Sequence, residues 1–138
     1  MLSIRSLNFG GTMKRSLAVA ILFSSVLFLS QSIQAAEIDD LLAKAKKEGK
    51  AVMLELGSVG CIPCEQMRPV MKKLTETYKG KLEVIFVDVR RDRSAAGRFG
   101  VYGIPTQVFL DRKGKEFHRH IGFYAYEEIV PVLKKYGL

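Results

Sequence analysis

The chain has 138 residues, and its 22 basic and 14 acidic residues give it a net charge of +8. No run of lysines and arginines is long enough for a nucleic-acid-binding arm, so the charge predicts no nucleic-acid partner. Four arginines cluster between residues 90 and 98. Such a cluster is typical of a solvated loop and helix face, and a docking patch for an acidic partner is the alternative.

Residues 1–36 show the order of regions that is typical of a secretory signal peptide. Lys14 and Arg15 supply positive charge, and the mostly apolar run SLAVAILFSSVLFL of 14 residues follows them. A tail of polar and small residues then offers a cleavage site after Ala35, with Ile33 at position −3. We therefore expect export to the periplasm or an equivalent space.

An uncleaved N-terminal anchor formed by residues 16–33 is the alternative, although a spanning helix needs roughly 20 apolar residues. Met13 would itself be a natural start of translation. Removing the leader removes three basic residues, which leaves 19 basic against 14 acidic residues and a net charge of +5. The remaining residues 37–138 suffice for one domain with its own hydrophobic core.

Apolar residues in this domain recur with helical spacing in some segments and form short continuous runs, typical of buried strands, in others. The predicted elements are a helix over 37–48, a strand over 51–56, a helix over 62–78, a strand over 82–89, a short helix over 94–99, strands over 106–110 and 115–121, and a helix over 126–136. The order α-β-α-β-α-β-β-α predicts an α/β fold with a central mixed sheet flanked by helices. Alternation with helices predicts that the first strands are parallel, and the final hairpin adds an antiparallel edge.

The only two cysteines, Cys61 and Cys64, stand at the start of the second predicted helix. They could form a structural disulfide, hold half of a metal site or make and break a disulfide in catalysis. A structural disulfide would close a very short loop and so stabilise little. A zinc site needs about four ligands, and the only histidines, His118 and His120, share a face of a predicted edge strand far from this loop. Redox chemistry is the favoured interpretation, and no metal is expected.

The position of Cys61 at a helix start favours a reactive thiolate. Unpaired N–H groups and the positive end of the helix dipole lower the pKa of such a cysteine. The thiolate is the species that attacks disulfides. Cys64 lies one turn further along the same side of the helix and can resolve the mixed disulfide, and Pro63 stiffens the segment between the two sulfurs.

Over almost all of residues 37–138 the sequence resembles thioredoxin-fold proteins. The resemblance rests on the CxxC motif at a helix start, a proline inside the following helix, a Gly-Ile-Pro-Thr loop and a glycine after the last strand. These features are Cys61-Ile62-Pro63-Cys64, Pro69, Gly103-Ile104-Pro105-Thr106 and Gly122. The resemblance implies the thioredoxin fold, with a cis Ile104–Pro105 bond that faces the sulfurs. It also implies that the backbone of Ile104 pairs with an extended substrate.

Glu55 interrupts an apolar strand at the position where thioredoxins carry a buried acid. Burial without a partner would raise the pKa of this carboxyl, so that it could accept the proton of Cys64 through water. Alternatively, the side chain could reach the surface or pair with Lys72 or Lys73.

The sequence departs from the family beside the cysteines. Gly60 stands where the family most often has tryptophan, and Ile62-Pro63 replaces the usual Gly-Pro. The dipeptide also lacks the histidine of strong oxidases. We assign Gly60, Ile62, Ile104 and Pro105 to substrate binding. Four aromatic residues are candidates for either the edge of the site or the core: Phe99, Tyr102, Phe123 and Tyr124.

These observations predict an exported thiol–disulfide oxidoreductase with Cys61, Cys64 and Glu55 as catalytic residues. We expect a monomer without a cofactor that reduces disulfides of exported proteins and is itself reduced by a membrane thiol donor. The alternatives are an oxidase or isomerase that uses the same site, and a non-enzymatic binding or metal-carrier module on a thioredoxin scaffold.

Overall fold

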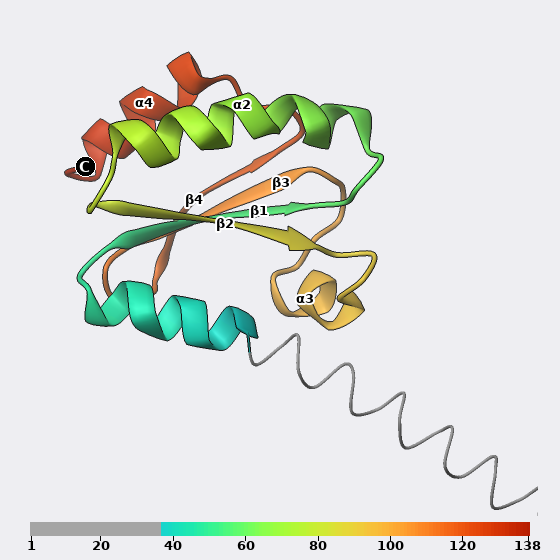
Figure 1. The fold of residues 1–138 in the computed structure, drawn as a ribbon, viewed down its shortest axis with the longest axis horizontal. Helices are drawn as coiled ribbons and strands as arrows, with labels where there is room; N and C mark the ends of the chain where they lie inside the picture. The colour runs from blue at the N-terminus through green and yellow to red at the C-terminus, as the bar shows by residue number, and fades with distance from the viewer. Residues whose placement is uncertain (1–36) are drawn as a thin grey trace, which may run out of the picture. The chain divides into compact units, whose positions relative to one another are not determined.

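The computed structural model describes residues 37–138, so the leader predicted for residues 1–36 lies outside the described residues. Each predicted element is present, with ends within one residue of the prediction. The elements are a first helix over 37–47, β1 (Ala51–Gly57), α2 (Ile62–Thr77), β2 (Leu82–Asp88), α3 (Arg93–Arg98), β3 (Thr106–Leu110), β4 (Glu116–Ile121) and α4 (Tyr126–Lys135) (Figure 1). None of the described helices is long and apolar enough to cross a membrane.

The four strands form one mixed sheet in the order β2-β1-β3-β4. β1 and β2 are parallel as predicted, and β3 and β4 form the predicted antiparallel hairpin. β3 also runs antiparallel to β1, so the parallel pairing expected from alternation stops at β2. The hairpin of β3 and β4 thus adds the predicted antiparallel edge to the parallel pair of β1 and β2.

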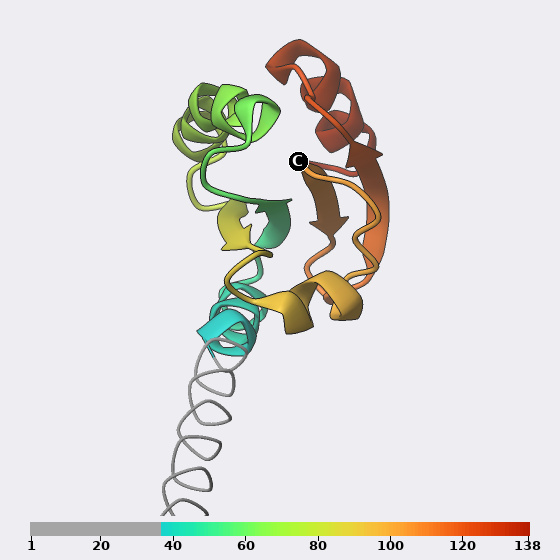
Figure 2. The ribbon, with the colours of Figure 1, turned by 90° about the vertical axis from the view of Figure 1, so that its right-hand side faces the viewer.

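Helices cover both faces of the sheet, as the fold class predicts. The first helix and α3 lie on one face, and α2 and α4 lie on the other (Figure 1, Figure 2). Because side chains alternate along a strand, Leu54 and Leu56 of β1 enter the core under the first helix, while Met53 enters the core under α2 and α4. Glu55 and Gly57 follow Met53 on the α2 face, which directs them toward the helix that begins after Cys61.

Candidate active site

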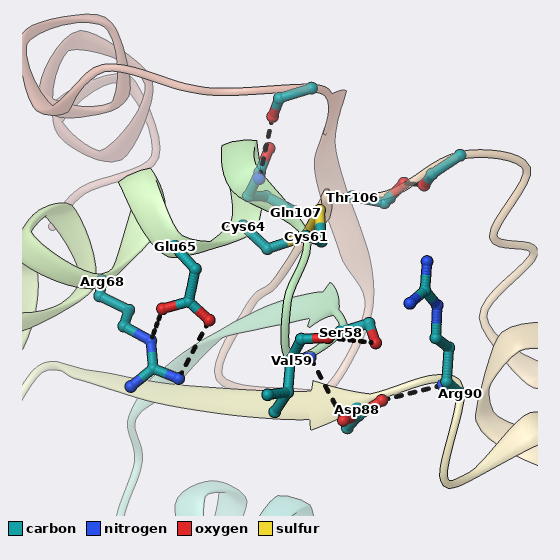
Figure 3. Close-up of a disulfide and its surroundings, with 12 residues drawn as sticks. Ser58, Val59, Cys61, Cys64, Glu65, Arg68, Asp88, Arg90, Thr106 and Gln107 are labelled. Carbon is teal, nitrogen blue, oxygen red and sulfur yellow. Dashed lines mark hydrogen bonds and ion pairs between the residues drawn. A yellow bond between two sulfur atoms is a disulfide. The ribbon is translucent and has the colours of Figure 1, made fainter.

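Cys61 and Cys64 occupy different environments at the start of α2. Cys61 is the N-cap residue, in extended backbone conformation, and Cys64 is the third residue of the helix. The two form a disulfide with Cα atoms 5.2 Å apart (Figure 3). Cys61 is partly exposed, whereas only 3% of Cys64 is exposed. An external sulfur can therefore reach Cys61 and not Cys64.

The start of α2 is electrostatically suited to a thiolate at Cys61. The N–H groups of Ile62 and Cys64 have no backbone acceptor, because the first intrahelical bond is donated by Glu65 to the Cys61 carbonyl at 3.0 Å. Glu65, the only acid in the first turn, forms an ion pair with Arg68. The nearest negative charge is thus partly compensated, and the helix dipole acts on Cys61.

The loop between β1 and α2 is anchored on the end of β2. Val89 N–H donates to the Gly57 carbonyl at 2.9 Å, and Val59 N–H donates to Asp88 Oδ2 at 3.4 Å. Asp88 Oδ1 accepts the N–H of Arg90 at 3.0 Å. Partial burial opposes ionisation, yet these backbone donors lower the pKa of Asp88, so the anchoring carboxylate stays charged.

The arginines that follow this anchor are only partly paired. Arg90, Arg91 and Arg93 are exposed, and Arg98 forms an ion pair with Asp39 of the first helix. In Figure 3 the Arg90 side chain extends from the end of β2. The four arginines therefore lie on the loop after β2 and on α3, as the sequence predicts.

Gly57 provides the space that Cys64 occupies. A Cβ atom at position 57 would lie 3.2 Å from Cys64 Sγ, 3.3 Å from Cys64 Cβ and 3.2 Å from Cε2 of Phe86. These distances are tighter than ordinary van der Waals contact. The absence of a side chain at Gly57 thus allows the second sulfur to lie directly against the end of β1.

Glu55 lies below this contact, on the same face of β1 and two residues earlier. Two residues of strand span about 7 Å, and because side chains alternate along a strand, the Glu55 carboxyl projects from the same face of β1 as the contact between Gly57 and Cys64. Glu55 is fully buried, and neither of its oxygens has a hydrogen-bond partner within residues 37–138. Burial raises the pKa of Glu55 to about 7, and the nearby Gln107 side chain limits the rise.

The alternatives for Glu55 do not hold. A fully buried side chain does not reach the surface. Lys72 pairs with Glu76 instead, and Lys73 pairs with Glu127. Glu55 is left as an uncompensated buried carboxyl beside the redox pair.

The Ile104–Pro105 bond is cis, as the resemblance implies. Leu56 of β1 pairs with Thr106 of β3, and continuing this register places Pro105 opposite Gly57 and hence next to Cys64. The Pro105 carbonyl accepts the N–H of Gly122 at 2.8 Å. Among the described residues, Ile104 makes no backbone–backbone hydrogen bond in this loop, which leaves its N–H and carbonyl available to an extended peptide.

Exposed apolar side chains lie on the three segments that meet here. Ile62 beside Cys61 is 76% exposed, and Tyr102 before the Pro105 loop is 94% exposed. Val59 and Ile121, which no sequence motif indicated, are also exposed. The exposed apolar residues on these segments are Val59, Ile62, Tyr102, Ile121 and Phe123. Gly60 adds no side chain to this surface and adopts a positive φ of 80°.

Two of the four aromatic candidates belong to the core instead. Tyr124 is buried under α2 and α4, and Phe99 packs against the core on the opposite face. Phe123 and Tyr124 are neighbours in the loop after β4, where no helical or strand period fixes the direction of a side chain. The sequence alone therefore could not show which of the two faces the core.

The two histidines share a face of β4 and are engaged in local contacts. His118 Nε2 lies 3.0 Å from the Tyr124 hydroxyl, and His120 Nε2 lies 3.1 Å from the Phe123 carbonyl oxygen. Burial lowers the pKa of His118, with the nearby positive charges of His120 and Lys135 contributing. Within residues 37–138 no group of three or more His, Cys, Asp or Glu side chains is arranged to hold a metal ion.

Gln107 is a buried polar residue that the sequence motifs did not indicate. It lies on β3 directly opposite Glu55, is fully buried, and donates from Nε2 to the Gly122 carbonyl at 3.1 Å. An amide in the otherwise apolar run QVFL was the available signal. Its significance depends on the strand register, which the sequence does not show.

The comparisons with known proteins agree with this geometry. The family model described as a thioredoxin-like domain matches residues 38–137. The thioredoxin of Staphylococcus aureus is 27% identical over 100 residues, which cover 72% of this chain and 95% of that protein. The structure of a poplar thioredoxin h is similar with a TM-score of 0.65 at 22% identity, over 75% of this chain and 91% of the other. Thioredoxin-2 of a malaria parasite has a TM-score of 0.59 at 24% identity, over 62% and 82% of the two chains.

A sheet of this topology with a CxxC pair at a helix start defines a thiol–disulfide oxidoreductase. The chain belongs to the thioredoxin-like family. Proteins of this family act on protein disulfides.

Proposed function

We propose that this protein is an exported reductase of protein disulfides, with Cys61 as the attacking and Cys64 as the resolving cysteine. The observation that carries the proposal is the difference between the two cysteines. Cys61 is reachable at the positive end of α2, whereas Cys64 is buried against Gly57 with Glu55 below it.

In the first step, the Cys61 thiolate attacks one sulfur of a substrate disulfide. A bond forms between Cys61 Sγ and that sulfur, and the substrate disulfide breaks and releases one substrate thiolate, which takes a proton from solvent. In the second step, Glu55 accepts the proton of Cys64 through water, because a carboxyl with a pKa of about 7 can accept a proton near neutral pH. Cys64 then attacks Cys61 Sγ and releases the second substrate thiolate. Two electrons have passed to the substrate, and the protein holds the Cys61–Cys64 disulfide.

The substrate is held by backbone pairing and apolar contact. An extended segment would pair with the free backbone groups of Ile104 beside cis-Pro105, a small case of β-augmentation. Ile62 and Tyr102 would cover its apolar side chains. Gly60 leaves the space beside Cys61 open for a bulky substrate, where many relatives carry tryptophan.

Trapping of mixed disulfides tests this assignment. In a Cys64→Ala variant the second step is blocked, so covalent adducts through Cys61 should accumulate in cells and disappear on treatment with dithiothreitol. The Cys61→Ala/Cys64→Ala double variant is the matched control and should trap nothing. Absence of Cys61-linked adducts from the single variant would contradict the assignment, and mass spectrometry of the adducts identifies the substrates.

The direction of electron flow is tested by the reduction potential of the pair. A reductase should titrate near −270 mV, the thioredoxin end of the family's range, whereas a value near −120 mV indicates an oxidase. In an oxidising compartment the protein then needs a membrane thiol donor for its own reduction. The in-cell ratio of reduced to oxidised Cys61–Cys64 reports whether such a donor acts.

A further inference from the structure

Gln107 occupies the centre of the sheet, where a polar side chain is costly. It is fully buried on β3, with Glu55 as its direct partner across β1. Burial of an amide costs free energy unless its donors and acceptor find partners. An apolar side chain at this position would avoid that cost, so the amide calls for a specific physical role.

One end of the Gln107 side chain holds the substrate-binding edge. Nε2 donates to the Gly122 carbonyl at 3.1 Å, and the N–H of Gly122 donates to the Pro105 carbonyl at 2.8 Å. Because a carbonyl only accepts, this contact identifies which end of the amide faces Gly122. Through Gly122, Gln107 therefore connects the centre of the sheet with the Pro105 loop.

The other end of the side chain lies beside Glu55. Gln107 Oε1 and both oxygens of Glu55 are buried without a hydrogen-bond partner in the described part of the chain. Nε2 carries two hydrogens, and the Gly122 carbonyl uses one of them. The amide thus offers the Glu55 carboxyl both one remaining N–H donor and one free acceptor.

We propose that Gln107 is a positioning residue for Glu55, serving as its hydrogen-bond partner in both protonation states. Protonated Glu55 donates its O–H to Gln107 Oε1, and ionised Glu55 accepts the remaining N–H of Nε2. A small rotation of the carboxyl exchanges the two arrangements. The carboxyl can therefore take up and release the proton of Cys64 while staying in place. The inference rests on the proposed role of Glu55 as the proton acceptor.

Few other titratable groups face Glu55. Cys64 of α2 lies above it, and Phe86 is its uncharged partner on β2. On the side of Gln107 away from Glu55, His120 of β4 is the cross-strand partner of Gln107. His120 contacts the Phe123 carbonyl and stacks on the Tyr124 ring. His118 lies one pair further along β4, and no ion pair involves Glu55 within residues 37–138.

The first test uses the full-length wild-type protein in its oxidised form, in which neither cysteine titrates. The side-chain NH₂ resonances of Gln107 should shift with pH and report a single transition near 7, the pKa expected for Glu55. The transition should vanish in Glu55→Gln. If it persists in that variant it belongs to a histidine, and the proposal is wrong.

The second test compares Gln107→Met with the wild type. A charge-assisted hydrogen bond is roughly twice as strong as a neutral one, so loss of the amide penalises ionised Glu55 more than protonated Glu55. The pKa of Glu55, followed by carboxyl ¹³C resonance, should rise by about one pH unit or more. The pH profile of disulfide reduction should move in the same direction. An unchanged pKa in a folded Gln107→Met protein contradicts the proposal.

A double variant separates this inference from the proposed function. In the Glu55→Gln background, Gln107→Met should leave the pH profile unchanged, because its effect acts through the carboxyl. A shift of equal size in both backgrounds would overturn the positioning role. If Glu55 and Gln107 titrate together but Glu55→Gln reduces disulfides as fast as wild type, the role of Glu55 fails while the coupling stands. Gln107→Asn retains an amide, and Val108→Ala on the same strand, whose side chain packs in the core of the opposite face, controls for general destabilisation.

Discussion

At the scale of single residues, the site depends on one close contact and one buried carboxyl group. The contact is between Gly57 and Cys64, where a Cβ would lie 3.2 Å from the sulfur. The carboxyl group is that of Glu55, which lies two residues earlier on the same face of β1. Each gives a prediction.

Gly57→Ala should destabilise the protein and slow the resolving step. The new methyl group would push against Cys64, whose backbone is held in α2, and overpacking of this kind costs about 1–3 kcal/mol. Stopped-flow kinetics should show a longer-lived mixed disulfide. Gly97→Ala is the matched control, since no heavy atom lies within 4 Å of its Cβ. It should raise stability by about 0.5–1 kcal/mol, and a Gly57→Ala protein with wild-type kinetics would contradict the contact.

Glu55 should make stability fall as the pH rises. The pKa of this carboxyl is about 7 in the folded protein against an ordinary value of 4.5. Between these values the native state keeps a proton that the unfolded state has lost, so rising pH favours unfolding, up to about 3 kcal/mol. Denaturant unfolding of the oxidised protein should show this fall from pH 4.5 to 7 relative to Glu55→Gln. If the free energy of unfolding changes with pH in the same way in both proteins, Glu55 is not the titrating group.

At the scale of elements, α3 depends on its N-cap. Asp92 Oδ1 accepts the N–H groups of Ser94 and Ala95 at 3.0 and 3.1 Å. At the other end of α3, Arg119 Nη1 on β4 donates to the Phe99 carbonyl at 2.8 Å. These bonds place the helix that leads into the Pro105 loop.

Asp92→Ala should therefore lower stability by about 1–2 kcal/mol, because two N–H groups of α3 lose their acceptor. Hydrogen exchange of the Ser94 and Ala95 amides should accelerate more than that of amides in β1. Asp92→Asn keeps an acceptor oxygen at the same position, so its loss of stability should be much smaller. Equal losses for Ala and Asn would indicate that the carboxylate charge, and not the cap, stabilises α3.

At the scale of the whole molecule, the leader predicted for residues 1–36 gives a prediction about processing. Cleavage after Ala35 should release a protein that begins at Ala36, because the residue at −1 must be small. Intact mass and N-terminal sequencing of the protein recovered from the periplasm of a Gram-negative host would check this. Ala35→Leu should block processing and leave the chain at full mass in the membrane fraction. Wild-type protein of full mass in the membrane fraction would instead favour the uncleaved anchor.

The order of elements and the placement of the cysteine pair at the start of a helix could be read from the sequence because both depend on local spacing. Helical and strand periods lie within single segments, and the CxxC motif lies within one helical turn. The parallel pair of β1 and β2 and the antiparallel hairpin of β3 and β4 are confirmed for the same reason, because a helical connection and a short turn are both local signals.

Only the tertiary structure decided which residues of different strands contact each other. Nothing local to Gln107 indicates that it faces Glu55, because register is set by how two distant strands align. The same holds for the approach of Gly57 to Cys64 and for the inward direction of Tyr124 beside the outward Phe123. The sequence by itself determined the elements and the reactive pair, since these are properties of neighbouring residues. The buried surroundings of that pair were decided by packing across the sheet, where residues far apart in the chain meet.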